Sequence, residues 1–475
     1  MNRILTNLTT LMVLALMTFV ASCSNSPKYA DLIPDDASVL MSVDVKQMAE
    51  QGNLGDGPLK AKIEKLIDDE SMPAEAKEKM KAVLDDPAQL GVDLRVPLLF
   101  TIDANSPDAG MMFAQLHSAS KLKDFIETMS KSDEALKLQT KGDLSYIDNG
   151  TTVMAFNDDV MCVSFNSNEK VELADIEAIF AGERSKTLKD SKALKSLFDA
   201  NGIASMLVMG NTMKAVQKYS PYAATMPDNI DYKDVAVLLS LESRKGAAVL
   251  TSEVITDSEQ WKDYMKKSDD ILQPIDNDML KLASKDGFAM VMSLNGKKLM
   301  EFLNANGLLK NAPASDKKLV ESLATINGGI VLSMEKFDIR NNNISMGIFA
   351  KTTDDSLSKE FGNGLGRLAN VGYTDNITYV TLREGKAPLE AVDNPLTKSD
   401  VKGLFYCRFN FESLKPFVER SYGATAIGGK TLIDAFSTAE LSYLGEGKCE
   451  LAFNMRDTSK YPLEIVSDQI SSYFN

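Results

Sequence analysis

The chain has 475 residues, of which 44% are hydrophobic and 25% charged, and its formal net charge is −15. This length predicts about two to four domains, and the composition is typical of a folded globular protein. The acidic balance argues against nucleic-acid partners and against docking on anionic lipid head groups, because both require a basic surface.

The N-terminal residues have the layout of a secretory signal peptide: a positive residue, an apolar run over 11–20 and small residues before Cys23. The segment Val-Ala-Ser-Cys that ends at Cys23 resembles the lipobox of bacterial lipoproteins, which implies that Cys23 becomes the lipid-modified first residue. We expect residues 1–22 to be the signal peptide and 23–34 a lipidated tether, with the membrane reached only through the lipid on Cys23. An ordinary signal peptide followed by an unmodified cysteine is the alternative.

A seven-residue apolar strand closed by Asp or Asn recurs along the chain. These strands are expected over 37–43, 204–210, 288–294 and 403–409, and the residues that close them are Asp44, Asn211, Asn295 and Asn410. Helical spacing follows each strand, and a short polar side chain accepts hydrogen bonds from the free amides of a first helical turn. We therefore predict that these four residues are structural N-caps rather than ligands.

A hairpin and a helix follow each of these strands, which predicts an α+β fold of four strand–helix–strand–strand–helix units with mainly antiparallel sheets. Extra strands after the first and third units predict two duplicated halves, 35–275 and 276–475. Apolar spacing near 59–84 predicts a helical insertion in the first half, with Pro73 in the first turn of its second helix. We interpret it as the cover of a sheet face; a lid or a partner-facing arm is the alternative.

Three cysteines remain after Cys23: Cys162, Cys407 and Cys449. All lie in apolar, strand-like runs, so buried free thiols are the favoured interpretation. A Cys407–Cys449 disulfide stays open, because both residues fall in one predicted unit.

The stretch over 33–44, Ile-Pro-Asp-Asp-Ala-Ser-Val-Leu-Met-Ser-Val-Asp, follows the lipobox and resembles a family of uncharacterised lipoproteins of Bacteroides-type bacteria, domain of unknown function 4836. The resemblance runs over most of the mature chain. It implies an envelope lipoprotein with internal repeats and brings no activity and no site residues. Surface-exported lipoproteins of such bacteria usually have acidic residues after the cysteine, and residues 24–30 have none. We therefore expect a lipid-anchored outer-membrane protein that faces the periplasm.

Motifs that would support catalysis or cofactor binding are sparse. His117 is the one histidine and is expected at a strand end, and no CxxC, HxH or HExxH spacing predicts zinc. The stretch 427–431 mimics the end of a phosphate loop but lacks its first glycine, and 362–366 follows a helical run rather than a strand. Paired acids such as Asp276 and Asp278 fall in predicted turns, so we expect neither catalysis nor a cofactor or metal. A hydrolase that uses two such carboxylates stays an alternative.

The chain's 24 methionines are its one compositional oddity. Many fall on predicted strands, where methionine fills irregular cores but also lines adaptable apolar binding surfaces. We predict a non-catalytic envelope protein that binds or interacts with an unknown partner. A periplasmic carrier of a lipid or other apolar ligand is the main alternative.

Overall fold

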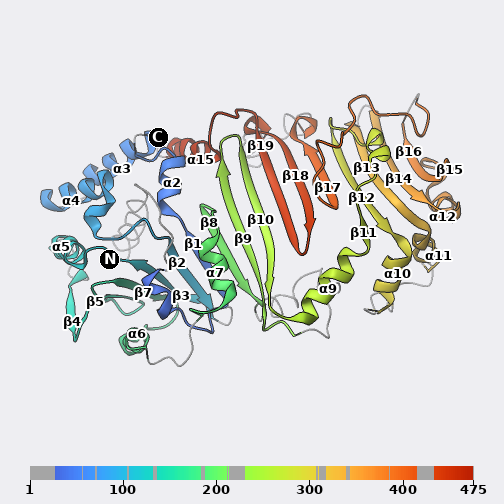
Figure 1. Cartoon of the computed structure of the whole chain (residues 1–475). Helices are drawn as coiled ribbons and strands as arrows, with labels where there is room; N and C mark the ends of the chain where they lie inside the picture. The colour runs from blue at the N-terminus through green and yellow to red at the C-terminus, as the bar shows by residue number, and fades with distance from the viewer. Residues whose placement is uncertain are drawn as a thin grey trace. The chain divides into compact units, whose positions relative to one another are not determined.

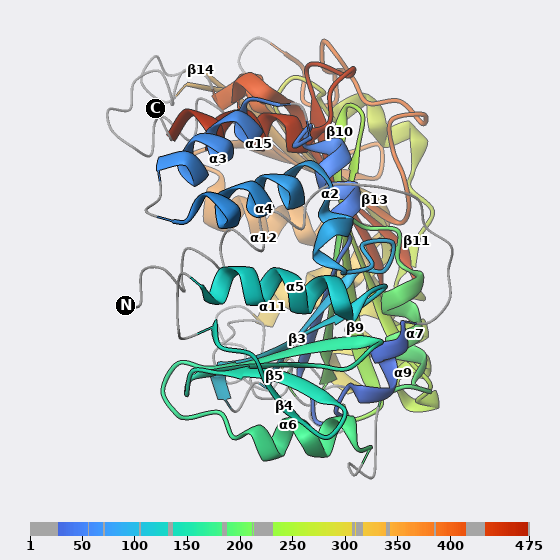
Figure 2. The same cartoon turned by 90° about the vertical axis from the view of Figure 1, so that its left-hand side faces the viewer.

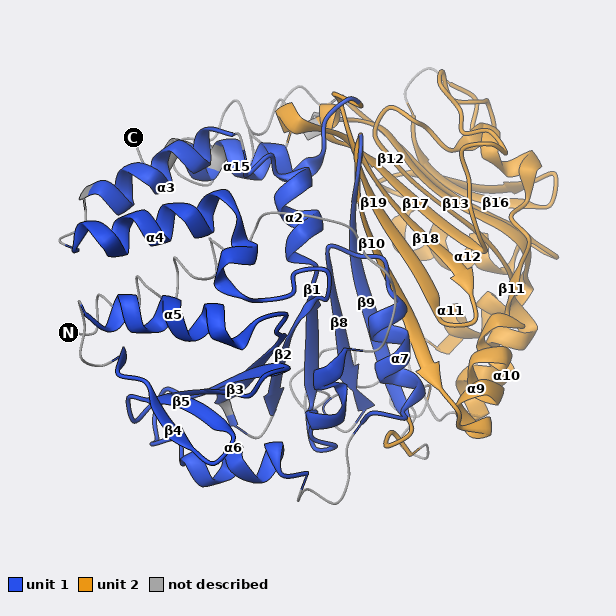
Figure 3. Ribbon diagram, turned by 60° about the vertical axis from the view of Figure 1, so that its left-hand side comes forward, with its two compact units in different colours: residues 1–216, 235–245, 459–475 blue, residues 217–234, 246–458 orange. Residues whose placement is uncertain are grey.

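A computed structural model of the chain describes residues 27–55, 57–69, 72–103, 106–131, 136–182, 188–210, 212, 231–305, 309, 317–338, 343–383, 386–414 and 433–473. The chain forms two compact units (Figure 3). Unit 1 consists of residues 1–216, 235–245 and 459–475, and unit 2 of residues 217–234 and 246–458. Figure 1 places their elements along the chain.

Unit 1 contains an antiparallel sheet. Its strands are β1 (Val39–Val43), β2 (Leu98–Asp103), β3 (Ser106–Gln115), β4 (Gln139–Lys141), β5 (Leu144–Asp148), β6 (Thr152–Phe156), β7 (Val160–Asn166), β8 (Ala204–Met209) and β9 (Val235–Arg244). They pair in the order β9-β8-β1-β2-β3-β7-β6-β5-β4. Strand β1, which begins the chain's fold, thus lies inside the sheet between two strands that come much later.

Helices lie on both faces of this sheet. They are η1 (Lys28–Leu32), α2 (Val45–Gln51), α3 (Pro58–Asp69), α4 (Ala74–Asp85), η2 (Pro87–Leu90), α5 (Ala119–Ser130), α6 (Leu173–Phe180), α7 (Lys192–Asp199) and α15 (Pro462–Tyr473). Figure 2 shows α5 on one side of strands β3 and β5 and α6 on the other. The main core joins α3, α4 and α5 to the ends of β2, β3 and β7 through residues such as Ile63, Met80 and Leu122. The predicted insertion near 59–84 is this α3–α4 pair, with Pro73 at the N-cap of α4.

Unit 2 contains a second antiparallel sheet. Its strands are β10 (Ala247–Thr256), β11 (Leu272–Gln273), β12 (Phe288–Asn295), β13 (Ile326–Asp338), β14 (Asn343–Thr352), β15 (Asn370–Thr374), β16 (Ile377–Leu382), β17 (Phe405–Asn410), β18 (Phe436–Gly445) and β19 (Lys448–Met455). They pair in the order β10-β19-β18-β17-β12-β13-β14-β16-β15, and β11 pairs with the end of β12.

The two faces of this second sheet have different covers. The helical elements of unit 2 are α9 (Glu259–Asp269), η5 (Asn277–Leu282), α10 (Gly296–Ala305), α11 (Lys317–Ser322), η7 (Leu323–Thr325), α12 (Ser356–Leu365) and η8 (Phe411–Leu414). One face packs its Val291, Val331 and Phe349 against η5 and the segment near Leu396. On the other face, α10 and α12 pack over one end of the sheet through Leu299 and Leu357.

The α+β class and antiparallel pairing follow the prediction, and the predicted strands coincide with β1, β8, β12 and β17 within about two residues. After the last of these strands, β17, the chain enters the 3-10 turn η8, and because residues 415–432 lie outside the described residues the helix expected there stays a prediction. The predicted boundary at 275/276 does not separate the compact units. Compactness and duplication are different properties, so the predicted halves stay a prediction.

Candidate functional site

An unbroken row of apolar side chains crosses the sheet of unit 1. Residues directly opposite each other on neighbouring strands point to the same face. The pairing registers place in one such row Leu239, Met206, Met41, Phe100, Met112, Val163, Met154 and Ile147. We call the sheet face that bears this row the methionine face.

The methionine face is sealed at one end and open in its middle. Phe100, Met112 and Val163 pack against the core under α5. Met41 keeps 38% of its surface exposed, and Ile102 of the neighbouring strand keeps 39%. On the opposite face of the same strands, Leu40 and Leu99 are fully buried. At β1 and β2, exposed apolar side chains therefore lie on the face that carries the methionines.

Charged side chains are absent from the described strand positions on the methionine face of β9, β8, β1, β2 and β7, and on β3 the exposed Asp108, four residues before Met112, occupies such a position. The charged residues of β9, Glu242 and Arg244, alternate with Leu239 and Leu241 and so point to the other face, where they pair with each other at 2.5 Å. On an exposed apolar area without charge, an apolar ligand or partner gains more binding free energy than a polar one, because it buries apolar surface.

Unit 2 repeats this arrangement on one face of its own sheet. The registers align Leu250, Leu451, Leu441, Cys407, Met290, Leu332, Ile348, Val380 and Val371 in one row. Leu441 keeps 38% of its surface exposed, and Cys407 and Met290 are half-buried. We call this the cysteine face.

Cys407 and Cys449 both lie on the cysteine face but remain separate thiols. Cys407 is opposite Leu441 on β18, whereas Cys449 lies on the next strand, β19, opposite Tyr443. The disulfide that the sequence left open is therefore absent. Burial raises the pKa of the Cys407 thiol, which keeps it protonated and weakly nucleophilic.

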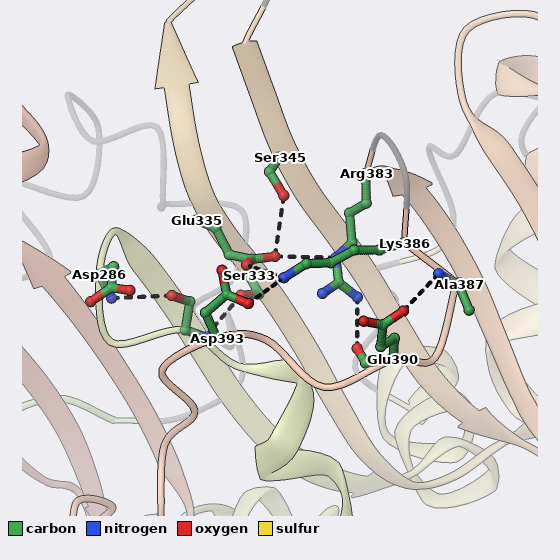
Figure 4. Close-up of polar contacts among 10 residues, drawn as sticks. Asp286, Ser333, Glu335, Ser345, Arg383, Lys386, Ala387, Glu390 and Asp393 are labelled. Carbon is green, nitrogen blue, oxygen red and sulfur yellow. Dashed lines mark hydrogen bonds and ion pairs between the residues drawn. The ribbon is translucent and has the colours of Figure 1, made fainter.

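A buried charged cluster surrounds Glu335, at the end of the opposite face of unit 2 (Figure 4). Its Oε1 accepts hydrogen bonds from Arg383 Nε and Ser345 Oγ, both at 3.1 Å, and its Oε2 accepts one from Lys386 Nζ at 3.4 Å. Lys386 Nζ also donates to Asp393 Oδ1 at 2.8 Å. These bonds fix the segment after β16 onto the strands β13 and β14.

This cluster is suited to holding the fold rather than to proton transfer. Only 2% of the Arg383 side chain and 10% of that of Glu335 are exposed. The hydrogen bond between Lys386 and Asp393 raises the pKa of the lysine and lowers that of the aspartate, so both move further from neutrality. A general acid or base works best with a pKa near the operating pH.

A second buried polar group occupies strands β17 and β18 on the same face. Arg408 Nη1 donates to Glu440 Oε1 at 3.0 Å. The Tyr406 side chain is buried beside them, its hydroxyl lacks a hydrogen-bond partner, and burial raises its pKa. These residues and the Glu335 cluster were not predicted, because the paired charges are far apart in the chain, 32 positions for Arg408 and Glu440 and 48 for Arg383 and Glu335, and no short motif links them.

Of the four predicted N-caps, two cap α-helices, one precedes a 3-10 turn and one lies outside the described residues. The Asp44 carboxylate accepts from Gln47 N at 2.8 Å at the start of α2, and Asn295 Oδ1 accepts from Lys298 N at 3.1 Å in α10. Asn410 Oδ1 accepts from Glu412 N at 3.0 Å, but the turn that follows is 3-10 rather than α-helical. Asn211 and Cys23 lie outside the described residues.

The candidate catalytic residues have structural partners. His117 is exposed, and its Nδ1 donates to Val92 O at 3.2 Å. Asp276 caps η5 through Asp278 N at 3.0 Å and pairs with Lys351 at 2.7 Å. Among the residues that the structure describes, no cluster of His, Cys, Asp and Glu could hold a metal ion.

The glycines at 362–366 belong to a helix and its C-terminal end rather than to a phosphate-binding loop. Gly362 and Gly364 lie within the last turns of α12, and Gly366 caps its C-terminus. The stretch 427–431 lies outside the described residues.

Comparison with known proteins places the chain in a family. The model of a domain of unknown function, DUF4836, matches residues 29–361. The chain belongs to the DUF4836 family. The matched region includes all of β1 to β14, and it therefore contains the whole methionine row.

Other comparisons of this DUF4836 protein add little. No curated protein matches it. Among solved structures, crystal form I of TP0453 is 13% identical, with a TM-score of 0.29 over 49% of this chain and 80% of that chain. Crystal form III of TP0453 is 12% identical, with a TM-score of 0.28 over 53% and 89%. At these TM-scores the likeness carries no functional argument. Within the described part of the chain, no helix is long and apolar enough to cross a membrane.

Proposed function

We propose that this DUF4836 protein is a non-catalytic binding module of the cell envelope that holds an uncharged apolar ligand on its methionine face. The observation that carries the proposal is the row of apolar side chains that crosses the sheet of unit 1 without a polar residue and in which Met41 keeps 38% of its surface exposed. Methionine is flexible and polarisable, so such a surface adapts to aliphatic chains of different shape.

We further propose that a lipid on Cys23 anchors the protein to the outer membrane, where it faces the periplasm. The lipobox-like segment before Cys23 supports this anchor, and the absence of acids after Cys23 supports the periplasmic orientation. An anchored module with an apolar face would collect ligands that are poorly soluble in the surrounding aqueous compartment.

We also propose that the chain arose by duplication of one half. Strand β1 lies between β8 and β2 in unit 1, and β12 lies between β17 and β13 in unit 2. The next strands outward also correspond, since β9 follows β8 and β18 follows β17. Two related apolar faces are what such a duplication would produce.

A polypeptide of the envelope that docks on the same face is the second candidate. The flexibility of methionine favours it as much as it favours an aliphatic ligand, because adaptable apolar surfaces also accept helices of partner proteins.

The test uses native mass spectrometry on the protein released from its own envelope, compared with the denatured sample. We expect a small adduct that is lost on denaturation in the wild type. Met41→Glu places a charge in the centre of the row and should abolish the adduct. Leu66→Glu is the matched control, because Leu66 on α3 is 41% exposed, close to the 38% of Met41, and, unlike Ile63 and Ile67 of the same helix, is not part of the core that packs on the methionine face.

The outcomes separate the candidates. An adduct that survives in Met41→Glu would contradict the assignment to the methionine face. A co-purifying polypeptide that Met41→Glu removes would replace the apolar ligand by a protein partner. Loss of the adduct in both variants would show that any added negative charge removes it, whatever its position. If the wild type carries neither an adduct nor a partner, the proposed function is overturned.

A further inference from the structure

Strand β15 ends the sheet of unit 2 with an edge that no other described strand covers. It forms a hairpin with β16 in which Asp375 and Asn376 make the two-residue turn, both with positive φ, of 52° and 60°. These dihedrals are those of a type I′ turn, whose flanking residues Thr374 and Ile377 form a hydrogen-bonded pair. The turn therefore fixes which backbone groups of β15 face inward.

Alternation along the hairpin places the other backbone groups at the open edge. Antiparallel pairs alternate between hydrogen-bonded and non-hydrogen-bonded, so Gly372 and Asn370 share the inward direction of Thr374. The N–H and C=O groups of Val371 and Tyr373 point outward. β15 thus offers a short ladder of unused donors and acceptors.

The usual protection of a sheet edge is missing from β15. Its sequence, Asn-Val-Gly-Tyr-Thr, contains no charge and no proline, and its pairing with β16 is continuous without a bulge. The outer strand β4 of unit 1 is protected by contrast: it has only three residues, all exposed, and its Lys141 pairs with Glu177 at 2.8 Å. Leu368, which precedes β15, is 74% exposed and adds an apolar anchor beside the open edge.

We propose that β15 pairs antiparallel with β15 of a second copy of this chain, centred on Gly372. This register places each outward-facing Val371 opposite Tyr373 of the other copy, so the unused groups of both strands satisfy each other. It also gives a β-branched–aromatic pair on each side of the centre, a favourable cross-strand combination.

Glycine at the centre fits this register. The two copies of Gly372 form a non-hydrogen-bonded pair, in which the strands' Cα atoms approach most closely. A Cβ on Gly372 would collide with the ring of Tyr379, which lies over it from β16. The ring of Tyr379 therefore explains the glycine within one chain, and the absence of a side chain leaves the central pair of the two copies unobstructed.

The charges at the two ends of β15 are complementary in the same arrangement. Exposed Arg367 precedes the strand and exposed Asp375 follows it. Antiparallel pairing brings the start of one strand to the end of the other, so each arginine comes near the aspartate of the second copy. A parallel pairing would place like charges together.

The test is disulfide trapping in the full chain with single variants Asn370→Cys and Thr374→Cys. Both positions are exposed, so the variants should fold like the wild type. In the proposed register Asn370 of one copy lies opposite Thr374 of the other. An oxidised mixture of the two variants should give a covalent dimer, whereas each variant alone should give no more than the wild type with its native cysteines.

A matched control uses Gln139→Cys and Lys141→Cys on β4, whose mixture should not form a dimer. Asp375→Asn, which keeps a residue that tolerates positive φ, should lower the yield of the β15 dimer severalfold, as should high salt. No dimer from the Asn370/Thr374 mixture would overturn the proposal. A dimer from either variant alone would overturn the register, and equal yields at β4 and β15 would show random collision.

Discussion

The buried ion pair of Glu335 and Arg383 shows why a single charge deep in unit 2 depends on its partner. The arginine is almost completely buried, and Glu335 is its carboxylate partner at 3.1 Å. Removing one member of a buried pair leaves an uncompensated charge, which costs far more than the pair itself contributes.

We therefore expect Glu335→Ala to lower the free energy of unfolding by about 3–5 kcal/mol, measured by urea denaturation. The double variant Glu335→Met with Arg383→Met should lose much less, because it removes both charges and keeps the volume filled. Asp393→Ala is the control within the same cluster, since 76% of this carboxylate side chain is exposed and its loss should cost at most about 1 kcal/mol. Equal losses from Glu335→Ala and the double variant would contradict this account.

Asp400 gives unit 2 a pH-dependent contribution to stability. Burial alone would raise the pKa of this carboxyl group, but hydrogen bonds from Lys285 Nζ and from Thr397 outweigh that effect and lower it to about 2. Lys285 Nζ and Thr397 N each lie 2.7 Å from its Oδ2. These bonds need the ionised form.

A carboxylate with a lowered pKa in the folded state stabilises the protein above its unfolded pKa, and the contribution is lost as the pH falls through the folded pKa. The stabilisation from Asp400 should therefore be complete near pH 5 and fade between about pH 4 and pH 2. Asp400→Asn should unfold more easily than the wild type at pH 7, and the difference should shrink over that acid range. A difference that stays constant from pH 7 to pH 2 would show that ionisation of Asp400 is not its source.

At the scale of elements, local hydrogen bonding decides where helices begin. Asp44 ends β1 and accepts from both the backbone N of Gln47 at 2.8 Å and its side-chain Nε2 at 2.9 Å. Replacing such a cap by alanine typically costs about 1 kcal/mol. We expect Asp44→Ala to lower the free energy of unfolding by about that amount, measured by thermal or urea unfolding. Asp44→Ser can still cap the helix and should lose clearly less. Similar losses in both variants would show that the effect does not come from capping.

The elements that sequence predicted are those with a local cause. Apolar runs, turn residues and caps lie within a few positions of one another, and they located β1, β12, the α3–α4 pair and Asp44. The order of strands in each sheet depends on pairing between distant segments, such as β1 with β8, which no local pattern contains. The same reason hid the cluster of Glu335 and Arg383, whose members are 48 positions apart.

The methionine content of the sequence predicted the candidate site only in part. It indicated that the methionines fill an irregular core or form an adaptable surface, and strand periodicity alone did not distinguish these two alternatives. The registers decide the geometry, because they put Met206, Met41 and Met112 on one face, and the exposure of Met41 places that face in contact with solvent. What binds there depends on chemistry outside the chain, so it remains a proposal.

At the scale of the whole molecule, the two apolar faces belong to different compact units and share no residue. If both bind uncharged apolar molecules, titration with an uncharged fluorescent probe such as N-phenyl-1-naphthylamine should reveal two sites. Effects at sites that share no partner are usually additive. Met41→Glu should remove the site of unit 1 and Leu441→Glu that of unit 2, while the double variant should retain neither.

Leu66→Glu should keep both sites, and unfolding curves of all variants would separate lost binding from lost structure. A probe signal that vanishes completely in either single variant would mean that the faces act as one site, and a signal that no variant changes would place the binding elsewhere in the chain.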